Sequence, residues 1–140
     1  MEKDLNRFIE AQENDYEIAL AEIKSGRKSS HWMWYIFPQF KGLGYSETSK
    51  FYAITDANEA KDYLNHPVLG TKLREITTEL LQLEENDAYK IMGSPDDLKL
   101  KSSMTLFNAI DETKENVFEK VLEKFFKGNL DNKTINLLKK

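Results

Sequence analysis

The stretch HPVLGTKLREITTELLQL, residues 66–83, decides the fold class of this chain. Its apolar residues recur at steps of three and four, which is the spacing of one face of an α-helix. Pro67 favours a helix start here, because proline suits the first position of a helix. The pattern therefore predicts a central core helix, and its buried face is expected to carry Leu69, Leu73, Ile76, Leu80 and Leu83.

Helix signals continue on both sides of this stretch. Asp4 is expected to cap a first helix that ends at Gly26, although a second capping pattern at Asn14 leaves open whether this is one helix or two. A helix over residues 46–54 would turn Phe51 and Tyr52 inward. The remaining start and stop signals are Asp56, Asp87, Gly93, the run Ser94-Pro95-Asp96-Asp97, Gly128 and Asp131. Together they predict an all-α fold, a compact single domain over residues 1–140 with about seven helices and short loops.

Composition excludes several classes of function. The chain has 140 residues, no cysteine and two histidines, so disulfides and cysteine-ligated zinc are ruled out and a histidine-rich metal centre is disfavoured. We expect no cofactor. The net charge of −4 argues against a protein that grips duplex nucleic acid. The sequence shows neither a membrane span nor a secretory signal, which predicts a cytoplasmic location.

One segment departs from this acidic character. Residues 23–46 contain no Asp or Glu, although the chain carries 24 such residues, and they hold both tryptophans. The apolar run over residues 32–37 has no clear period, so it is either a buried helix or a short strand, and Pro38 ends it. A second acid-free window covers residues 98–110. These two segments are the expected places for an anion to bind.

Several motifs resemble the domain of unknown function 1810 family. The likeness runs from Asp4 to about Phe126, and it implies a small, mainly helical domain without a settled activity. After Phe107 only the helical pattern continues the likeness. The matching pieces are Asp4-Leu5-x-Arg7-Phe8, Ala11-Gln12, Gly26-x-Lys28, Ser30-His31-Trp32-Met33-Trp34-x-Ile36-Phe37-Pro38-Gln39, Gly42-Leu43-Gly44, His66-Pro67-Val68-Leu69-Gly70 and Asp97-x-Lys99-Leu100-x-Ser102-Ser103-Met104-Thr105-Leu106-Phe107.

His31 is the candidate catalytic residue, because it alone in this region titrates near neutral pH. It either transfers protons or merely satisfies a backbone group. Trp32 and Trp34 either stack a flat ring or pack in the core. No P-loop, nucleophile elbow or metal site is recognisable, so the sequence does not decide whether the protein is an enzyme.

The candidate ligand-binding residues are polar or cationic apart from the tryptophans. Arginine holds a phosphate or carboxylate through two parallel bonds, and lysine acts as a point charge. If the helix carrying the second window meets the first segment, the two build one site. The predicted set is Arg27, Lys28, Ser30, Trp32, Trp34, Gln39, Lys99, Ser102 and Ser103.

Two functions fit these residues. The first is a pocket for an anionic, nucleotide-derived small molecule. The second is a non-enzymatic module that docks a protein partner through its aromatic stretch. Nucleic acid and membrane are disfavoured as partners. A concave pocket lined by His31, Trp34, Lys28 and Lys99 would favour the first function, whereas a flat or convex patch, or complete burial of both tryptophans, would count against it.

Overall fold

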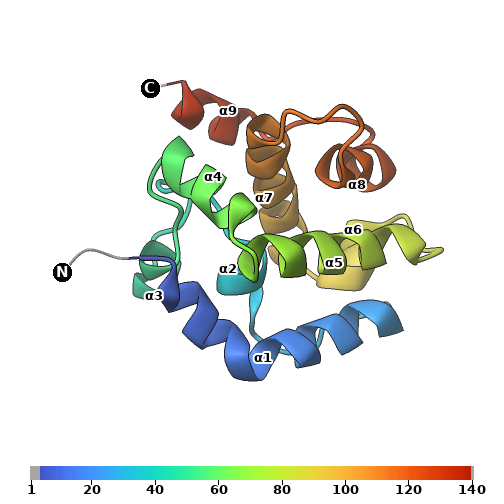
Figure 1. Cartoon of the computed structure of the whole chain (residues 1–140). Coiled ribbons are helices and arrows are strands. Elements are labelled where there is room, and N and C mark those ends of the chain that lie inside the picture. Colours follow the sequence, from blue (N-terminus) through green and yellow to red (C-terminus); the bar gives the residue numbers. More distant parts are fainter. Residues whose placement is uncertain (1–3, 140) are drawn as a thin grey trace.

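The computed structural model describes residues 4–139, which form nine α-helices and no extended strand (Figure 1). Within these residues, one isolated parallel bridge joins Phe40 to Ile54. The all-α, compact fold is as predicted. There are more helices than the expected seven, and three of the nine have only four or five residues. The helices are α1 (Asn6–Ser25), α2 (Met33–Ile36), α3 (Glu47–Phe51), α4 (Ala57–Asn65), α5 (Leu69–Gln82), α6 (Ala88–Met92), α7 (Asp96–Ile110), α8 (Val117–Phe126) and α9 (Asn132–Leu138).

Helices α1 and α5 pack side by side along one edge of the molecule (Figure 1). The predicted apolar face of α5 is buried from Leu69 to Leu80, and Leu83 is partly buried just beyond the helix end. Gly70 allows α4 and α5 to meet closely, since a Cβ at this position would lie 1.9 Å from the Leu64 carbonyl oxygen. Any larger residue there would push the two helices apart.

Helix α7 stands at the centre and packs against α4, α6, α8 and α9 (Figure 1). A chain of buried aromatic rings links four helices through it. Phe8 of α1 meets Tyr63 of α4 edge to face at 5.0 Å between centroids, Tyr63 lies 5.5 Å from Phe107 of α7, and Phe107 lies 5.8 Å from Phe118 of α8. Each such pair stabilises the fold by about 0.5–1.5 kcal/mol beyond its buried area.

The structure decides one open expectation and changes two others. The first helix is unbroken at Asn14 and runs to Gly26, whose φ of 88° is the left-handed cap that glycine favours. Helix α3 is shorter than predicted, and Phe51 at its end is about half exposed rather than inward. Ser94 does not cap α7, because the Asp97 N–H donates instead to the Gly93 carbonyl at 2.8 Å.

The start of α5 is also capped differently from the prediction. Pro67 lies before the helix, and the His66 side chain supplies the cap. Its Nδ1 accepts hydrogen bonds from the N–H groups of Val68 and Leu69, at 3.1 and 3.2 Å. His66 therefore has a structural role as the acceptor for the first turn of the helix.

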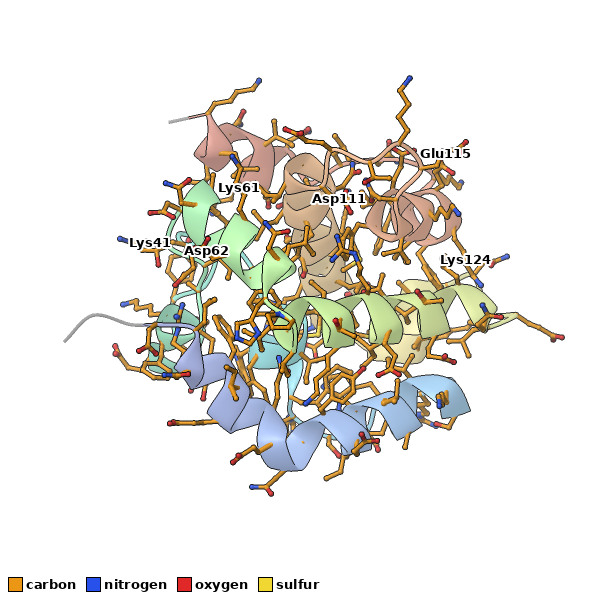
Figure 2. All side chains as sticks on the ribbon, in the orientation of Figure 1. Lys41, Lys61, Asp62, Asp111, Glu115 and Lys124 are labelled. Atoms are coloured by element: carbon orange, nitrogen blue, oxygen red, sulfur yellow. The ribbon has the colours of Figure 1, made fainter. Side chains whose placement is uncertain are left out.

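The other end of α5 is held by α8. The ammonium group of Lys124 donates to the carbonyl of Leu81 at 3.2 Å and to that of Leu83 (Figure 2). These bonds satisfy carbonyl groups that the end of a helix leaves without partners. Within residues 4–139, no helix combines the length and the apolar character that crossing a bilayer requires.

Candidate functional site

The loop between α1 and α2 wraps around a carboxylate from the protein itself. Glu22 Oε1 accepts hydrogen bonds from Ser29 N at 2.8 Å, Ser30 N at 3.0 Å and Trp32 Nε1 at 2.9 Å. Ser30 Oγ donates to Oε2 of the same residue at 2.5 Å. The Ser30 hydroxyl, which was predicted to bind a ligand, is thus engaged by Glu22, and so is the indole N–H of Trp32.

These bonds change the acidity of Glu22. Burial acts to raise its pKa, but the hydrogen bonds from Ser30, Ser29 and Trp32 together outweigh burial and lower the pKa to about 2. The group is therefore ionised throughout the physiological range. A permanent internal anion at this position orders the loop that carries the aromatic stretch.

A second carboxylate joins the two segments that the sequence singled out. Asp96, at the start of α7, lies 2.9 Å from Lys28 Nζ and 3.6 Å from Lys99 Nζ. The Lys28 ammonium lies 4.9 Å from the Trp32 ring centroid and the Lys99 ammonium 5.6 Å from that of Trp34. Each lysine is thus placed over one tryptophan, and Asp96 bridges the two lysines.

The two lysine–tryptophan pairs differ in access. The Lys28 side chain is 7% exposed and Trp32 is 1% exposed, so this pair is part of the core. The Lys99 side chain is 28% exposed, and Trp34 is only partly buried. Only the second pair therefore offers both a ring and a charge to a molecule from solvent.

Trp34 and Lys99 lie in a groove of about 490 Å³. The groove runs between the loop that precedes α3, the N-terminal half of α7 and the start of α9. Its wall combines two lysines with hydroxyl, apolar and aromatic side chains. The lining residues are Trp34, Gln39, Leu43, Gly44, Tyr45, Ser46, Ser49, Pro95, Leu98, Lys99, Ser102, Asp131 and Lys133.

Asp131 organises the α9 side of this groove. Its Oδ2 accepts hydrogen bonds from Ser102 Oγ at 3.0 Å, from Thr134 N at 3.2 Å and from the Thr134 hydroxyl. Its own N–H donates to Thr105 Oγ1 at 2.9 Å. Asp131 thus caps α9, ties it to α7 and positions Lys133, while its negative charge is shared among three donors.

The chain was compared with protein families, curated proteins and solved structures. It matches the family described as "Protein of unknown function (DUF1810)" over residues 2–138. The chain belongs to the DUF1810 family. It is also similar to the conserved hypothetical protein Rv1873 from Mycobacterium tuberculosis, a crystal structure with 41% sequence identity and a TM-score of 0.95. That likeness covers 99% of this chain and 98% of the other. The comparison with curated proteins found no match.

The family match extends past the residues that the sequence motifs covered. The motifs ended at Phe107 and the expected family region at about Phe126, whereas the match continues to residue 138. The DUF1810 region therefore includes α9. It also includes Asp131 and Lys133, which line the groove.

The structure brings four of the ten predicted site residues of this DUF1810 protein into the groove. They are Trp34, Gln39, Lys99 and Ser102, and they come from both acid-free segments. Their role in binding stays a prediction. The meeting of the two segments is a fact of the structure.

The other six predicted residues lie elsewhere. Lys28, Ser30 and Trp32 are engaged by Asp96 and Glu22 as described above. Ser103 is fully buried in α7, and its Oγ has no hydrogen-bond partner within residues 4–139. His31 and Arg27 are exposed on the loop before α2, outside the residues that line the groove.

Sequence reasoning missed several groove residues. Tyr45, Ser46 and Ser49 follow the Gly42-Leu43-Gly44 motif, and their closeness to a family motif was the available signal. Lys133 lies far along the chain and had no local signal. For the two carboxylates Glu22 and Asp96, the available signal was their closeness to the acid-free windows. Glu22 immediately precedes the first window, and Asp96 lies two residues before the second.

A second cavity of about 440 Å³ opens between α4, α5 and the end of α7, where Figure 2 labels Lys61 and Asp111. Its arginine, Arg74, donates to Asp111 Oδ2 and to the Leu64 carbonyl, both at 3.2 Å. The Arg74 guanidinium is thus already hydrogen-bonded to groups of the protein itself. No cluster of three or more His, Asp or Glu side chains suited to a metal ion occurs in the described part of the chain.

Proposed function

We propose that the groove between Trp34 and Lys99 binds a small organic anion, either a phosphorylated or a carboxylated metabolite. The observation that carries this proposal is the Lys99 ammonium, 5.6 Å from the centroid of the Trp34 ring at the wall of a groove of about 490 Å³. Binding sites for small molecules commonly have volumes of about 300–1,000 Å³ and combine apolar walls with a few polar groups.

Lys99 is available for a ligand in a way that Lys28 is not. Its distance of 3.6 Å from Asp96 is longer than a charge-assisted hydrogen bond, and its distance from the Trp34 ring is close to the upper limit of about 6 Å for a cation–π contact. Neither contact holds the ammonium firmly. A ligand anion therefore displaces weak interactions when it binds Lys99.

The charges around the groove favour an anion. The groove lining carries Lys99, Lys133 and Asp131, a net charge of +1 in a protein whose net charge is −4, while Lys28 outside the lining is paired with Asp96. Asp131 is also occupied by three hydrogen-bond donors. The local field thus attracts anions although the whole molecule repels them.

The test is a thermal-shift screen with inorganic phosphate, sugar phosphates, nucleotides and dicarboxylates. A ligand at 100 times its Kd stabilises the protein by about 2.7 kcal/mol, which is readily visible as a rise in Tm. Lys99→Gln is expected to abolish the rise. The control is Lys101→Gln, which removes an equal charge from the same helix outside the groove lining.

The change in Tm distinguishes support for the site from its rejection. A rise in Tm that Lys99→Gln abolishes and Lys101→Gln preserves supports the site. If no compound raises the Tm, or if both variants respond alike, the proposal is wrong. His31 lies outside the groove lining and has no role in this proposal.

A second candidate is an acidic peptide that docks along the same groove. The observation in its favour is the apolar rim, where Leu98 is 60% exposed and Tyr45 is 80% exposed. Apolar and aromatic anchors beside lysines suit a peptide that carries both acidic and apolar side chains. Leu98→Asp is expected to weaken peptide binding, measured by fluorescence anisotropy, while the thermal shift produced by small anions stays in place.

A further inference from the structure

Tyr45 is held at the mouth of the groove by constraints on both sides. On one side, Gly44 packs so closely against α3 that a Cβ would lie 2.4 Å from Ser49 Oγ. On the other, Ser46 caps α3 by accepting a hydrogen bond from Ser49 N at 3.1 Å. The position of the Tyr45 backbone is therefore determined. Yet its ring is 80% exposed, although it lines a concave surface.

Trp34 is also without the partners that tryptophans usually have. Within residues 4–139 its ring contacts no other aromatic ring, and its indole N–H has no hydrogen-bond acceptor. Trp32, two residues earlier, has both: it packs against Phe37 at 6.1 Å and donates to Glu22. A partly buried tryptophan with a free N–H, in the same groove as an exposed tyrosine, is suited to a flat heteroaromatic ring.

The charge of the groove limits the anionic part of such a ligand. Lys99, Lys133 and Asp131 line the groove and leave a net charge of +1 there, because the nearby Lys28 and Asp96 pair with each other. This matches one phosphate group better than a chain of two or three, whose additional negative charges would face Asp96 and Asp131 without compensation. Phosphate is a suitable partner for lysines, which act as point charges toward it.

From these observations we infer that the ligand is a nucleoside monophosphate, with its base against Trp34 and Tyr45 and its phosphate at Lys99 and Lys133. The inference rests on the proposed function and specifies its ligand. Base stacking gives the ring subsite affinity without requiring many hydrogen bonds, because every base has a flat face. Tyr45 then acts as a binding residue.

The first experiment compares AMP, GMP, ribose 5-phosphate and ATP by isothermal titration calorimetry with the full chain. We expect AMP or GMP to bind at least about tenfold more tightly than ribose 5-phosphate, because stacking adds to the phosphate contacts. ATP is expected to bind more weakly than the monophosphates. Ribose 5-phosphate binding as tightly as both monophosphates, or ATP binding more tightly than either, overturns the inference.

The second experiment tests Tyr45 directly. Tyr45→Ala is expected to weaken AMP binding by about 5- to 100-fold, the range observed when a stacking aromatic is removed, and Tyr45→Phe to restore it. Tyr89→Ala is the matched control, because Tyr89 is 58% exposed on α6 and does not line the groove. Equal AMP affinity in Tyr45→Ala and the wild type contradicts the inference.

The two proposals fail in different ways. If ribose 5-phosphate and inorganic phosphate bind through Lys99 but bases add nothing, the anion site stands and the ring subsite is wrong. If none of these phosphates binds, the inference is wrong, and the anion site is wrong as well if no dicarboxylate raises the Tm. Quenching of Trp34 fluorescence by AMP, absent in Trp34→Phe, gives an independent readout in which the buried Trp32 serves as the internal reference.

Discussion

The ammonium group of Lys28 lies 2.9 Å from Oδ2 of Asp96 and joins two segments that are far apart in the sequence. The same lysine donates to the Ser30 carbonyl at 2.5 Å and lies over the Trp32 ring. Asp96 in turn reaches Lys99 at the groove. The contact between Lys28 and Asp96 therefore connects the ordered loop before α2 with the candidate site on α7.

Lys28→Met is expected to destabilise the protein by about 1–3 kcal/mol, because it leaves the Ser30 carbonyl and one oxygen of Asp96 without their partner. Urea unfolding measures the change. Lys41→Met is the control, since Lys41 is exposed and points outward (Figure 2). Its free energy of unfolding should change by less than about 0.5 kcal/mol. Similar losses in the two variants would show that the pair with Asp96 is not stabilising.

Arg7→Ala is expected to be the more damaging substitution. The guanidinium donates to Asp4 O, Phe51 O and Ala53 O, and two of its nitrogens lie 3.1 Å from the Glu59 carboxylate. It is buried, so its removal leaves several carbonyls without a donor and Glu59 with the hydrogen bonds from Thr55 but without its countercharge, at a cost of about 3–5 kcal/mol. A fall in Tm of about 10 °C is expected.

Arg27→Ala serves as the control for Arg7. Arg27 is an exposed arginine just after α1, and the loss of its side chain should change the Tm by no more than about 2 °C. If Arg7→Ala also falls within that range, the buried network contributes nothing measurable to stability.

The lowered pKa of Glu22 predicts how the stability of the protein depends on pH. Its pKa in the folded protein is about 2, below the 4.5 of an ordinary glutamate, so its stabilising effect is complete above pH 4.5 and is lost as the pH falls toward 2. Glu22→Gln is therefore expected to be less stable than the wild type at pH 7. It should also lose less stability between pH 5 and pH 2.

Urea unfolding at several pH values between 7 and 2 provides the measurement. Glu13→Gln changes an exposed residue of the same helix and should follow the wild-type profile. A Glu22→Gln profile parallel to that of the wild type would mean that the hydrogen bonds from the loop do not lower the pKa of Glu22.

Asp131→Ala is expected to loosen α9 and with it the groove. The substitution removes the cap of α9, worth about 0.5–2 kcal/mol, together with the bond from Ser102. Faster amide hydrogen exchange over residues 132–138 is the expected result. Asp87→Ala removes the equivalent cap from α6 and should leave exchange in α9 unchanged.

The helices were largely predictable because their signals are local. Capping residues such as Asp56, Asp87 and Asp131 act within one helical turn, and the apolar face of α5 follows directly from its spacing. The wrong predictions concern helix starts where two neighbouring groups could fill the same role. At the start of α5 the His66 side chain took the role expected of Pro67, and at α7 the Gly93 carbonyl replaced Ser94.

The candidate site was only partly predictable. Trp34, Gln39, Lys99 and Ser102 were found because they lie in unusual acid-free segments. The same reasoning also selected Lys28, Ser30 and Trp32, whose partners turned out to be Glu22 and Asp96. A segment without acids predicts unpaired cations when only the sequence is considered. In the folded protein, acids from other segments can pair with those cations.

The helical fold, the family and the two acid-free segments follow from the sequence alone, whereas the meeting of these segments does not. Periodicity and capping are encoded within a few residues, and the family motifs are continuous in the chain. It is the packing between α1, α2, α7 and α9 that determines which tryptophan faces the groove and which lysine remains available. Trp32 is closed off by Glu22 and Lys28, whereas Trp34 remains beside Lys99 at the wall of the groove.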